Sequence, residues 1–136
     1  MKTARITMAG AVQELTEGNF DSSLEGADKL AIVEFYTNTC VNCMAMRPVY
    51  EALAIELEKY ALFARINVAE SQAIAARYGI MGVPTFKFFC GQRPIGELVG
   101  AINATILGNT IKDFVRHKNE CISKSTPIIY EMDGYG

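Results

Sequence analysis

Two short runs of apolar residues dominate the hydrophobic pattern of the chain. Residues 29–36 (KLAIVEFY) and 61–68 (ALFARINV) are each eight residues long and rich in residues that favour strands. Eight residues suit a strand better than a helix, and a run with almost no alternation is typical of a strand covered on both faces. Both runs are therefore predicted to be buried central strands.

Segments with helical spacing separate these strands. Residues 40–60 place Val49, Leu53 and Leu57 four apart, with Glu and Lys on the other face, so they are predicted to form an amphipathic helix. Pro48 lies inside this segment and is expected to kink it. The other predicted helices are 16–27, 71–79 and 103–119.

Three further strands complete the pattern. Residues 11–15 are predicted as an edge strand, while 85–90 and 95–101 are predicted to form a hairpin around GQRP. The resulting order is βαβαβαββα. Helical crossovers favour parallel pairing of the first strands, and the hairpin makes the last two antiparallel. We therefore predict an α/β fold, a three-layer α/β/α sandwich with a central mixed sheet.

Composition and charge narrow the class of protein. The chain has 136 residues, half of them hydrophobic, which suits one domain with its own core. Its net charge of −2 and scattered Lys and Arg argue against nucleic acid as a partner. No apolar run approaches the roughly 18 residues of a membrane span, and residues 1–18 are too weakly apolar for a secretion signal. We expect a cytoplasmic monomer without a membrane partner.

Cys40 and Cys43 form a CxxC motif between the first buried strand and the long helix. The unpaired N–H groups and the dipole of a helix start favour a thiolate, so Cys40 is expected to have a lowered pKa and to act as a nucleophile. Cys43, three residues later, can resolve a mixed disulfide at Cys40. A pair of small buried residues or half of a metal site are the alternatives.

The motif and its surroundings resemble the thioredoxin family. The resemblance covers roughly residues 11–118 and rests on 15–43, 46–57 and 64–89, followed by GELVGA and the last predicted helix. It combines the CxxC motif, a Val-Pro-Thr loop about forty residues later, and an acid in the strand before the motif. The resemblance implies a thioredoxin fold in residues 1–118, followed by an extension at 119–136 that is expected either to be disordered or to dock on the domain.

The resemblance also implies roles for single residues. Cys40 matches the attacking cysteine and Cys43 the resolving one. Pro84 matches a cis-proline that packs against the disulfide, whereas an ordinary trans turn is the alternative. Val83 matches the residue whose backbone groups bind an extended substrate segment, and Gly100 matches a glycine that lets the substrate approach closely.

Glu34 is the candidate for proton transfer. The resemblance matches it to a buried acid beneath the resolving cysteine, and Arg65 to a basic residue beside that acid. Burial of Glu34 within AIVEFY should raise its pKa, which suits proton transfer with Cys43, while Arg65 should lower it again. A purely structural Glu34–Arg65 ion pair is the alternative.

The sequence departs from the family around the motif. Thr39 stands where the family usually has Trp, Val41 and Asn42 replace Gly-Pro, and the chain contains no Trp. Tyr36 occupies a second position where Trp is common, and we count it among the substrate-binding residues. These changes leave the direction of reaction and the natural reductant open, because related proteins span potentials from roughly −270 to −120 mV.

The chain also has two further cysteines, a single histidine, and two methionines directly after the CxxC motif. Cys90 should lie roughly 20 Å from the CxxC motif, at the end of the domain toward which the last predicted helix carries Cys121. A disulfide between Cys90 and Cys121 is one hypothesis, and two thiols without a role are the other. His117 is expected on the surface. Met44 and Met46 are expected either to contact partner proteins or to pack in the core.

Together these features predict a thiol–disulfide oxidoreductase that reduces protein disulfides. It should need no cofactor, only an external thiol reductase or a small-molecule thiol as the electron source. A redox-inert binding or chaperone-like module with the same fold is the alternative, and a metal carrier is a third option. Partners are expected to be proteins that contain disulfides.

Overall fold

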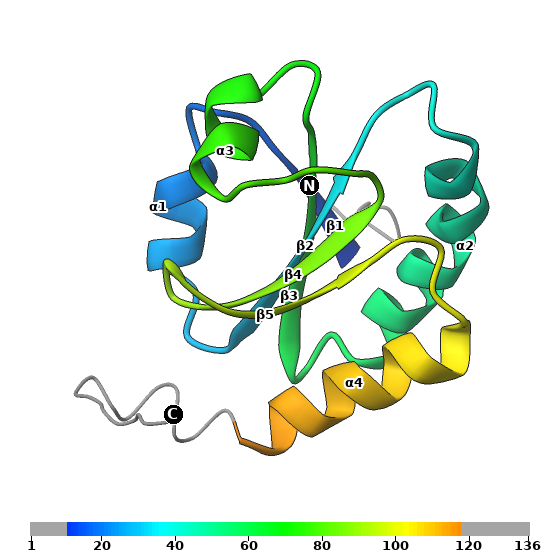
Figure 1. Ribbon diagram of the computed structural model, residues 1–136. Coiled ribbons are helices and arrows are strands. Elements are labelled where there is room, and N and C mark those ends of the chain that lie inside the picture. Colours follow the sequence, from blue (N-terminus) through cyan, green and yellow to red (C-terminus); the bar gives the residue numbers. More distant parts are fainter. Residues whose placement is uncertain (1–10, 118–136) are drawn as a thin grey trace, which may run out of the picture.

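In residues 11–117, which the computed structural model describes, five strands form a single mixed sheet in the order β1-β3-β2-β4-β5 (Figure 1). The strands are β1 (Val12–Leu15), β2 (Leu30–Tyr36), β3 (Ala61–Asn67), β4 (Thr85–Cys90) and β5 (Arg93–Val99). Strands β1, β3 and β2 pair in parallel, whereas β4 is antiparallel to both β2 and β5. The predicted mixed sheet is confirmed, and β2 is its buried centre.

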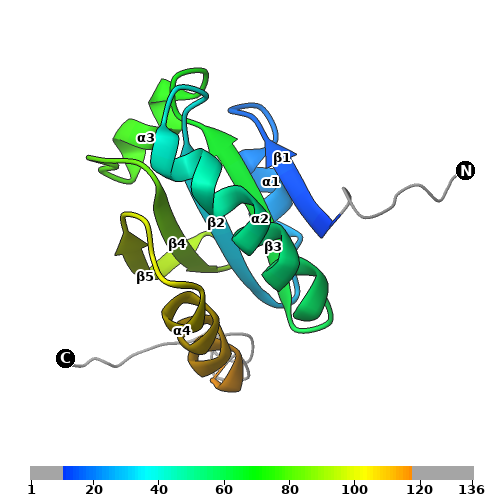
Figure 2. The same cartoon turned by 90° about the vertical axis from the view of Figure 1, so that its right-hand side faces the viewer.

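Helices cover both faces of this sheet, as the three-layer prediction requires. The helices are α1 (Phe20–Glu25), α2 (Val41–Glu56), α3 (Gln72–Arg77) and α4 (Ala104–Arg116). Helices α1 and α3 lie on one face, and α2 and α4 lie on the other (Figures 1 and 2). None of the helices in the described part of the chain is long and apolar enough to cross a membrane.

Each face of the sheet has its own hydrophobic core. Under α1 and α3, Phe20 packs edge-on against Phe89 with ring centroids 5.8 Å apart. Under α2 and α4, fully buried Tyr50 packs against Phe63. The Tyr50 hydroxyl also lies 2.9 Å from the carbonyl oxygen of Ile32 and 2.8 Å from that of Ala64. Its hydrogen bonding to the strands fixes α2 on the sheet, and with it the CxxC motif at the start of α2.

Two element boundaries differ from those predicted. Helix α1 begins at Phe20 instead of Thr16, because Thr16 and Asn19 form a turn in which each side chain accepts a hydrogen bond from the other's backbone N–H. Strand β5 begins at Arg93, since the hairpin turns within 91–92 and Arg93 already pairs with Cys90. Pro94 is tolerated there because β5 is an edge strand.

The other predicted elements appear within a few residues of their expected ends. Helix α2 continues through Pro48, which supplies no N–H to the helix. Helix α3 follows Ser71 and is followed by Gly79, whose positive φ of 64° terminates it as predicted. The predicted extension at 119–136, including Cys121, lies outside the described residues.

Candidate active site

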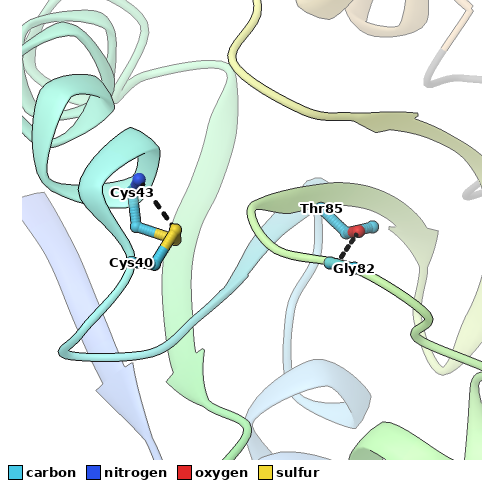
Figure 3. Close-up of a disulfide and its surroundings, with 4 residues drawn as sticks. All are labelled: Cys40, Cys43, Gly82 and Thr85. Atoms are coloured by element: carbon cyan, nitrogen blue, oxygen red, sulfur yellow. Dashed lines mark hydrogen bonds between the residues drawn. A yellow bond between two sulfur atoms is a disulfide. The ribbon is translucent and has the colours of Figure 1, made fainter.

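Cys40 and Cys43 form a disulfide at the N-terminus of α2 (Figure 3). Their Cα atoms are 5.2 Å apart, a separation that suits a disulfide between the first turn of a helix and its cap. Cys40 is the N-cap residue, and its Sγ accepts a hydrogen bond of 3.0 Å from the Cys43 backbone N–H. The predicted redox pair is therefore present at the predicted place.

The two cysteines differ in how far a partner can reach them. Cys43 is 4% exposed, whereas Cys40 is only half-buried. The same N–H donor that reaches Cys40 in the disulfide would stabilise a thiolate there after reduction, and the helix dipole adds to this effect. Accessibility and electrostatics thus single out the same sulfur atom.

The loop before β4 contains a cis peptide bond and lies near the disulfide (Figure 3). The Val83–Pro84 bond is cis, as predicted, and Pro84 is buried. Thr85 directly follows this bond, pairs with Phe35 near the end of β2, and donates a 2.7 Å hydrogen bond to the Gly82 carbonyl (Figure 3). The loop is thereby fixed next to the chain segment that leads from β2 to Cys40.

Gly100 lies beside this loop. Its backbone N–H donates a 2.8 Å hydrogen bond to the Pro84 carbonyl, and its φ of 101° is one that L side chains rarely adopt. A Cβ atom at Gly100 would meet no heavy atom within 4 Å, so the space above it is open. Val83, Pro84 and Gly100 therefore lie together, as the sequence predicts.

Apolar side chains are exposed on the segments around the motif. Val41 is 77% exposed, Met44 57% and Met81 94%. A hollow of about 280 Å³ between α3 and the cis-proline loop is lined by Met81, Val83 and other residues. Met46, by contrast, is buried in the core, so the two methionines that the sequence grouped together have different environments.

Glu34 is buried in β2, on the sheet face that α2 covers. It is 2% exposed, and within residues 11–117 its carboxyl forms no hydrogen bond or ion pair. Burial raises the pKa of Glu34 to about 7, and the nearby positive charges of Arg65 and Arg47 offset only part of that rise. The predicted opposition of burial and Arg65 is confirmed.

The structural Glu34–Arg65 ion pair, the alternative role for Glu34, is not formed. Arg65 lies at the register position next to Glu34, but its Nε is 3.0 Å from Glu14 Oε1 and its Nη1 is 3.4 Å from Glu51 Oε2. Burial alone would lower the pKa of Arg65, yet these carboxylates raise it, so the guanidinium stays charged. Arg65 is thus next to Glu34 but bonded elsewhere.

Tyr36 contacts both Glu14 and Arg65. It is 7% exposed, and its hydroxyl donates a 2.6 Å hydrogen bond to Glu14 Oε2. Its ring lies 5.7 Å from the guanidinium carbon of Arg47 and 5.9 Å from that of Arg65. Burial and the bond to Glu14 raise the pKa of Tyr36 to about 12, so it remains a donor. Little of its ring is left for the substrate contact that the sequence predicts.

Three charged residues around Glu34 were missed by the sequence analysis: Glu14, Arg47 and Glu51. Glu14 pairs in register with Arg65, which pairs with Glu34, so the three form one row across β1, β3 and β2. Glu34 and Arg65 interrupt apolar strands, and that signal was visible in the sequence, whereas Glu14 lies in the half-polar β1. The strand order that brings them together was not visible in the sequence.

The remaining candidates lie apart from this site. His117 is exposed at the end of α4, as predicted. Cys90 is buried at the end of β4 opposite Pro84, and its proposed partner Cys121 lies outside the described residues. Within residues 11–117 no group of three or more His, Cys, Asp or Glu side chains could hold a metal ion.

The ionisation of Glu34 should make stability depend on pH. A folded-state pKa of about 7 against 4.5 for the ordinary group means that the folded protein binds more protons between these values, so stability should fall as pH rises through them. The full effect is about 3 kcal/mol. Urea unfolding of the oxidised protein from pH 4.5 to 8 should show this fall for the native chain and for Glu56→Gln, but not for Glu34→Leu. Equal slopes in all three would show that Glu34 does not titrate as described.

Comparison with known proteins places this site in a family. The family model described as Thioredoxin matches residues 11–113. The thioredoxin of Chlorobaculum thiosulfatiphilum is 34% identical over 107 residues, which cover 79% of this chain and 99% of that protein. Thioredoxin 2 of Chlorobaculum tepidum is 32% identical over 108 residues, with coverage of 79% and 99%. A solved structure of a thioredoxin variant from Halobacterium salinarum matches with a TM-score of 0.70 and 30% identity, over 76% of this chain and 90% of that one.

A CxxC disulfide at the start of a helix, next to a cis-proline loop on a mixed sheet, defines a thiol–disulfide oxidoreductase. The chain belongs to the thioredoxin family. Its activity is the reduction of protein disulfides. The predictions of fold, family and reaction are therefore confirmed.

Proposed function

We propose that Cys40 attacks the substrate disulfide and that Cys43 completes the reaction. The Cys40 thiolate forms a mixed disulfide with one substrate sulfur and releases the other as a thiolate. Cys43 then loses its proton, attacks the Cys40 sulfur and releases the second substrate thiolate. Two electrons pass to the substrate, both of its sulfurs end as thiols after protonation, and the protein is left with the Cys40–Cys43 disulfide.

The position of Cys40 carries this assignment. Its sulfur lies at the start of α2, accepts the Cys43 N–H at 3.0 Å, and is the more accessible of the two. A nucleophile must be both ionised and reachable, and Cys40 meets both conditions. Cys43, at 4% exposure, is suited to react only with a sulfur already bound to Cys40.

Glu34 takes the proton of Cys43 in this scheme. A base works best when its pKa is close to the working pH, and burial brings the pKa of Glu34 to about 7. The carboxyl has no hydrogen-bond partner within residues 11–117 that would hold it in either protonation state. It is therefore available for a proton that moves during the second step.

The substrate binds as an extended segment along the cis-proline loop. The half-buried Val83 offers backbone groups, Pro84 fixes the direction of the loop, and the open space above Gly100 lets the substrate backbone approach. The exposed Val41 and Met44 add apolar contact area. Tyr36 and Arg65 both bond to Glu14, and these contacts favour a positioning role over direct contact with the substrate.

The protein works as a monomer in the cytoplasm. There it takes part in electron transport and contributes to cellular redox homeostasis. Each turnover leaves a Cys40–Cys43 disulfide, so a thiol reductase or a small-molecule thiol must return two electrons to it. No cofactor takes part in the exchange itself, because attack, resolution and proton transfer all use side chains of this chain and of the substrate.

Limited alkylation tests the assignment of roles. The fully reduced protein is treated with a small amount of iodoacetamide at pH 7, and the labelled cysteine is identified by mass spectrometry. Cys40 should react at least about tenfold faster than Cys43, because it is more accessible and more ionised. Equal labelling of the two cysteines, or faster labelling of Cys43, would overturn the assignment. Asn42→Ala, which changes one of the two exposed residues between them, should keep the order of labelling.

A further inference from the structure

We propose that Glu14 and Glu51 are positioning residues, which hold the Arg65 guanidinium away from Glu34 and so keep the Glu34 carboxyl able to take up and release a proton near neutral pH. We call Glu14 and Glu51 the carboxylate pair. The inference rests on the proposed role of Glu34 and adds to it the residues that control this acid.

The contacts of Arg65 carry the first step. Arg65 and Glu34 are direct register partners on adjacent parallel strands, where strand spacing is about 4.8 Å. An ion pair between them would be expected on distance alone. Instead the Arg65 side chain, which is 14% exposed, directs Nε to Glu14 at 3.0 Å and Nη1 to Glu51 at 3.4 Å. One member of the carboxylate pair comes from β1 and the other from α2, so the guanidinium is held between two separate elements.

Tyr36 strengthens this arrangement. Its hydroxyl bonds Oε2 of Glu14 at 2.6 Å, while Oε1 of the same carboxylate bonds Arg65. Its ring lies 5.9 Å from the Arg65 guanidinium carbon. Glu14 is thereby fixed through both oxygens and Arg65 through two nitrogens and a ring face, which limits the freedom of Arg65 to turn toward Glu34.

The charges around Glu34 balance when every packed element is counted. In the oxidised protein, where Cys43 is disulfide-bonded and does not titrate, the charged and titratable neighbours are Glu14 from β1, Tyr36 from β2, Arg65 from β3, and Arg47, Tyr50 and Glu51 from α2. The β4 register partner of Glu34 is the apolar Phe86. Two cations thus face two carboxylates, both tyrosines are neutral, and the net charge acting on Glu34 is small. Burial is then the dominant influence on its ionisation.

Removal of one carboxylate should upset this balance in a defined direction. Glu14→Gln or Glu51→Gln removes a negative charge near Glu34 and frees a donor of Arg65, and both effects favour the charged form of Glu34. Both substitutions preserve shape, and the side chains they replace are 49% and 47% exposed, so the variants should fold. Arg65→Gln removes a cation and should act in the opposite direction.

Carbon-13 NMR of side-chain carboxyl carbons in the oxidised protein, where Cys43 carries no proton, provides the test, with the Glu34 signal assigned by its loss in Glu34→Gln. The titration midpoint of Glu34 should fall by at least about half a pH unit in Glu14→Gln and in Glu51→Gln, and rise in Arg65→Gln. Glu56 lies on α2, as Glu51 does, but it pairs with Lys112 and not with Arg65. Glu56→Gln is therefore the matched control and should leave the Glu34 midpoint unchanged. A Glu34 midpoint that stays the same in both carboxylate variants would overturn the proposal.

A second readout separates this inference from the proposed function. The pH–rate profile of disulfide reduction should shift in the same direction as the NMR midpoint in each variant. If the midpoint moves and the rate profile does not, the carboxylate pair controls Glu34 as inferred, but Glu34 is not the proton acceptor. If the midpoint stays and the native rate profile still depends on Glu34, the role of the carboxylate pair is refuted and the proposed function stands.

Discussion

Cys40→Ser is expected to reduce the rate of protein-disulfide reduction by about a thousandfold or more. Serine keeps the size of the side chain and its place at the start of α2, but its hydroxyl is not ionised at neutral pH and cannot form a disulfide. The measurement is the reduction of insulin disulfides by dithiothreitol in the presence of each protein, followed as turbidity. The Cys40→Ser protein should give the rate of the reaction without protein.

Two comparisons make this result specific. Asn42→Ala changes one of the two exposed residues between the cysteines and should retain most of the activity, and circular dichroism should show both variants folded. Substantial activity in folded Cys40→Ser would contradict the assignment of the nucleophile, because Cys43 is too buried to take its place.

Cys43→Ser should stop the reaction at the mixed disulfide. Cys40 keeps its position at the start of the helix, attacks the substrate and stays bonded to it, because the sulfur that would release the product is gone. After incubation with a disulfide-containing protein, mass spectrometry without reductant should find a covalent complex at Cys40. A reductant should cleave the mixed disulfide and release the two proteins. Steady-state turnover should fall to the background rate.

The double variant Cys40→Ser, Cys43→Ser is the control for this experiment. It should form no covalent complex, which excludes bonds made by other cysteines. A Cys43→Ser protein that binds its partners unchanged and without a covalent bond would instead support the redox-inert binding module.

The fold was predictable because the apolar runs, the helical spacing and the helix stop signals of the sequence all indicate the same elements. Buried strands β2 and β3 are continuous apolar runs, α2 has a regular apolar spacing, and Gly79 ends α3 where expected. The start of α1 was wrong because Thr16 and Asn19 satisfy each other's backbone in a turn, and no spacing rule reveals that pairing.

The cysteine pair and the cis-proline were also predictable, since a CxxC motif and a Val-Pro-Thr loop are local patterns. The surroundings of Glu34 were not. Glu14 is separated from Arg65 by 51 positions, and only the order of β1, β3 and β2 brings them together. The sequence analysis paired Arg65 with Glu34 on the neighbouring strand, whereas the structure pairs Arg65 with Glu14 and Glu51.

Tyr36 illustrates the same limit. At the end of a buried strand its side chain could face either the substrate or the core, and alternation along the strand cannot decide between them. Its hydroxyl is bonded to Glu14 and its ring lies near Arg47 and Arg65, so three other elements determine its environment. Contacts of this kind depend on tertiary structure and are absent from any local pattern.

A redox titration of the Cys40–Cys43 pair shows whether the two cysteines work as one redox couple. The protein is equilibrated against graded dithiothreitol buffers and alkylated, and the blocked thiols at Cys40 and Cys43 are counted by mass. We expect one reversible two-electron transition in which both cysteines change together, with a midpoint toward the low end of the roughly −270 to −120 mV range, as a reductase requires. Failure of the two cysteines to form a disulfide at any potential would rule out the oxidoreductase and favour the redox-inert binding module.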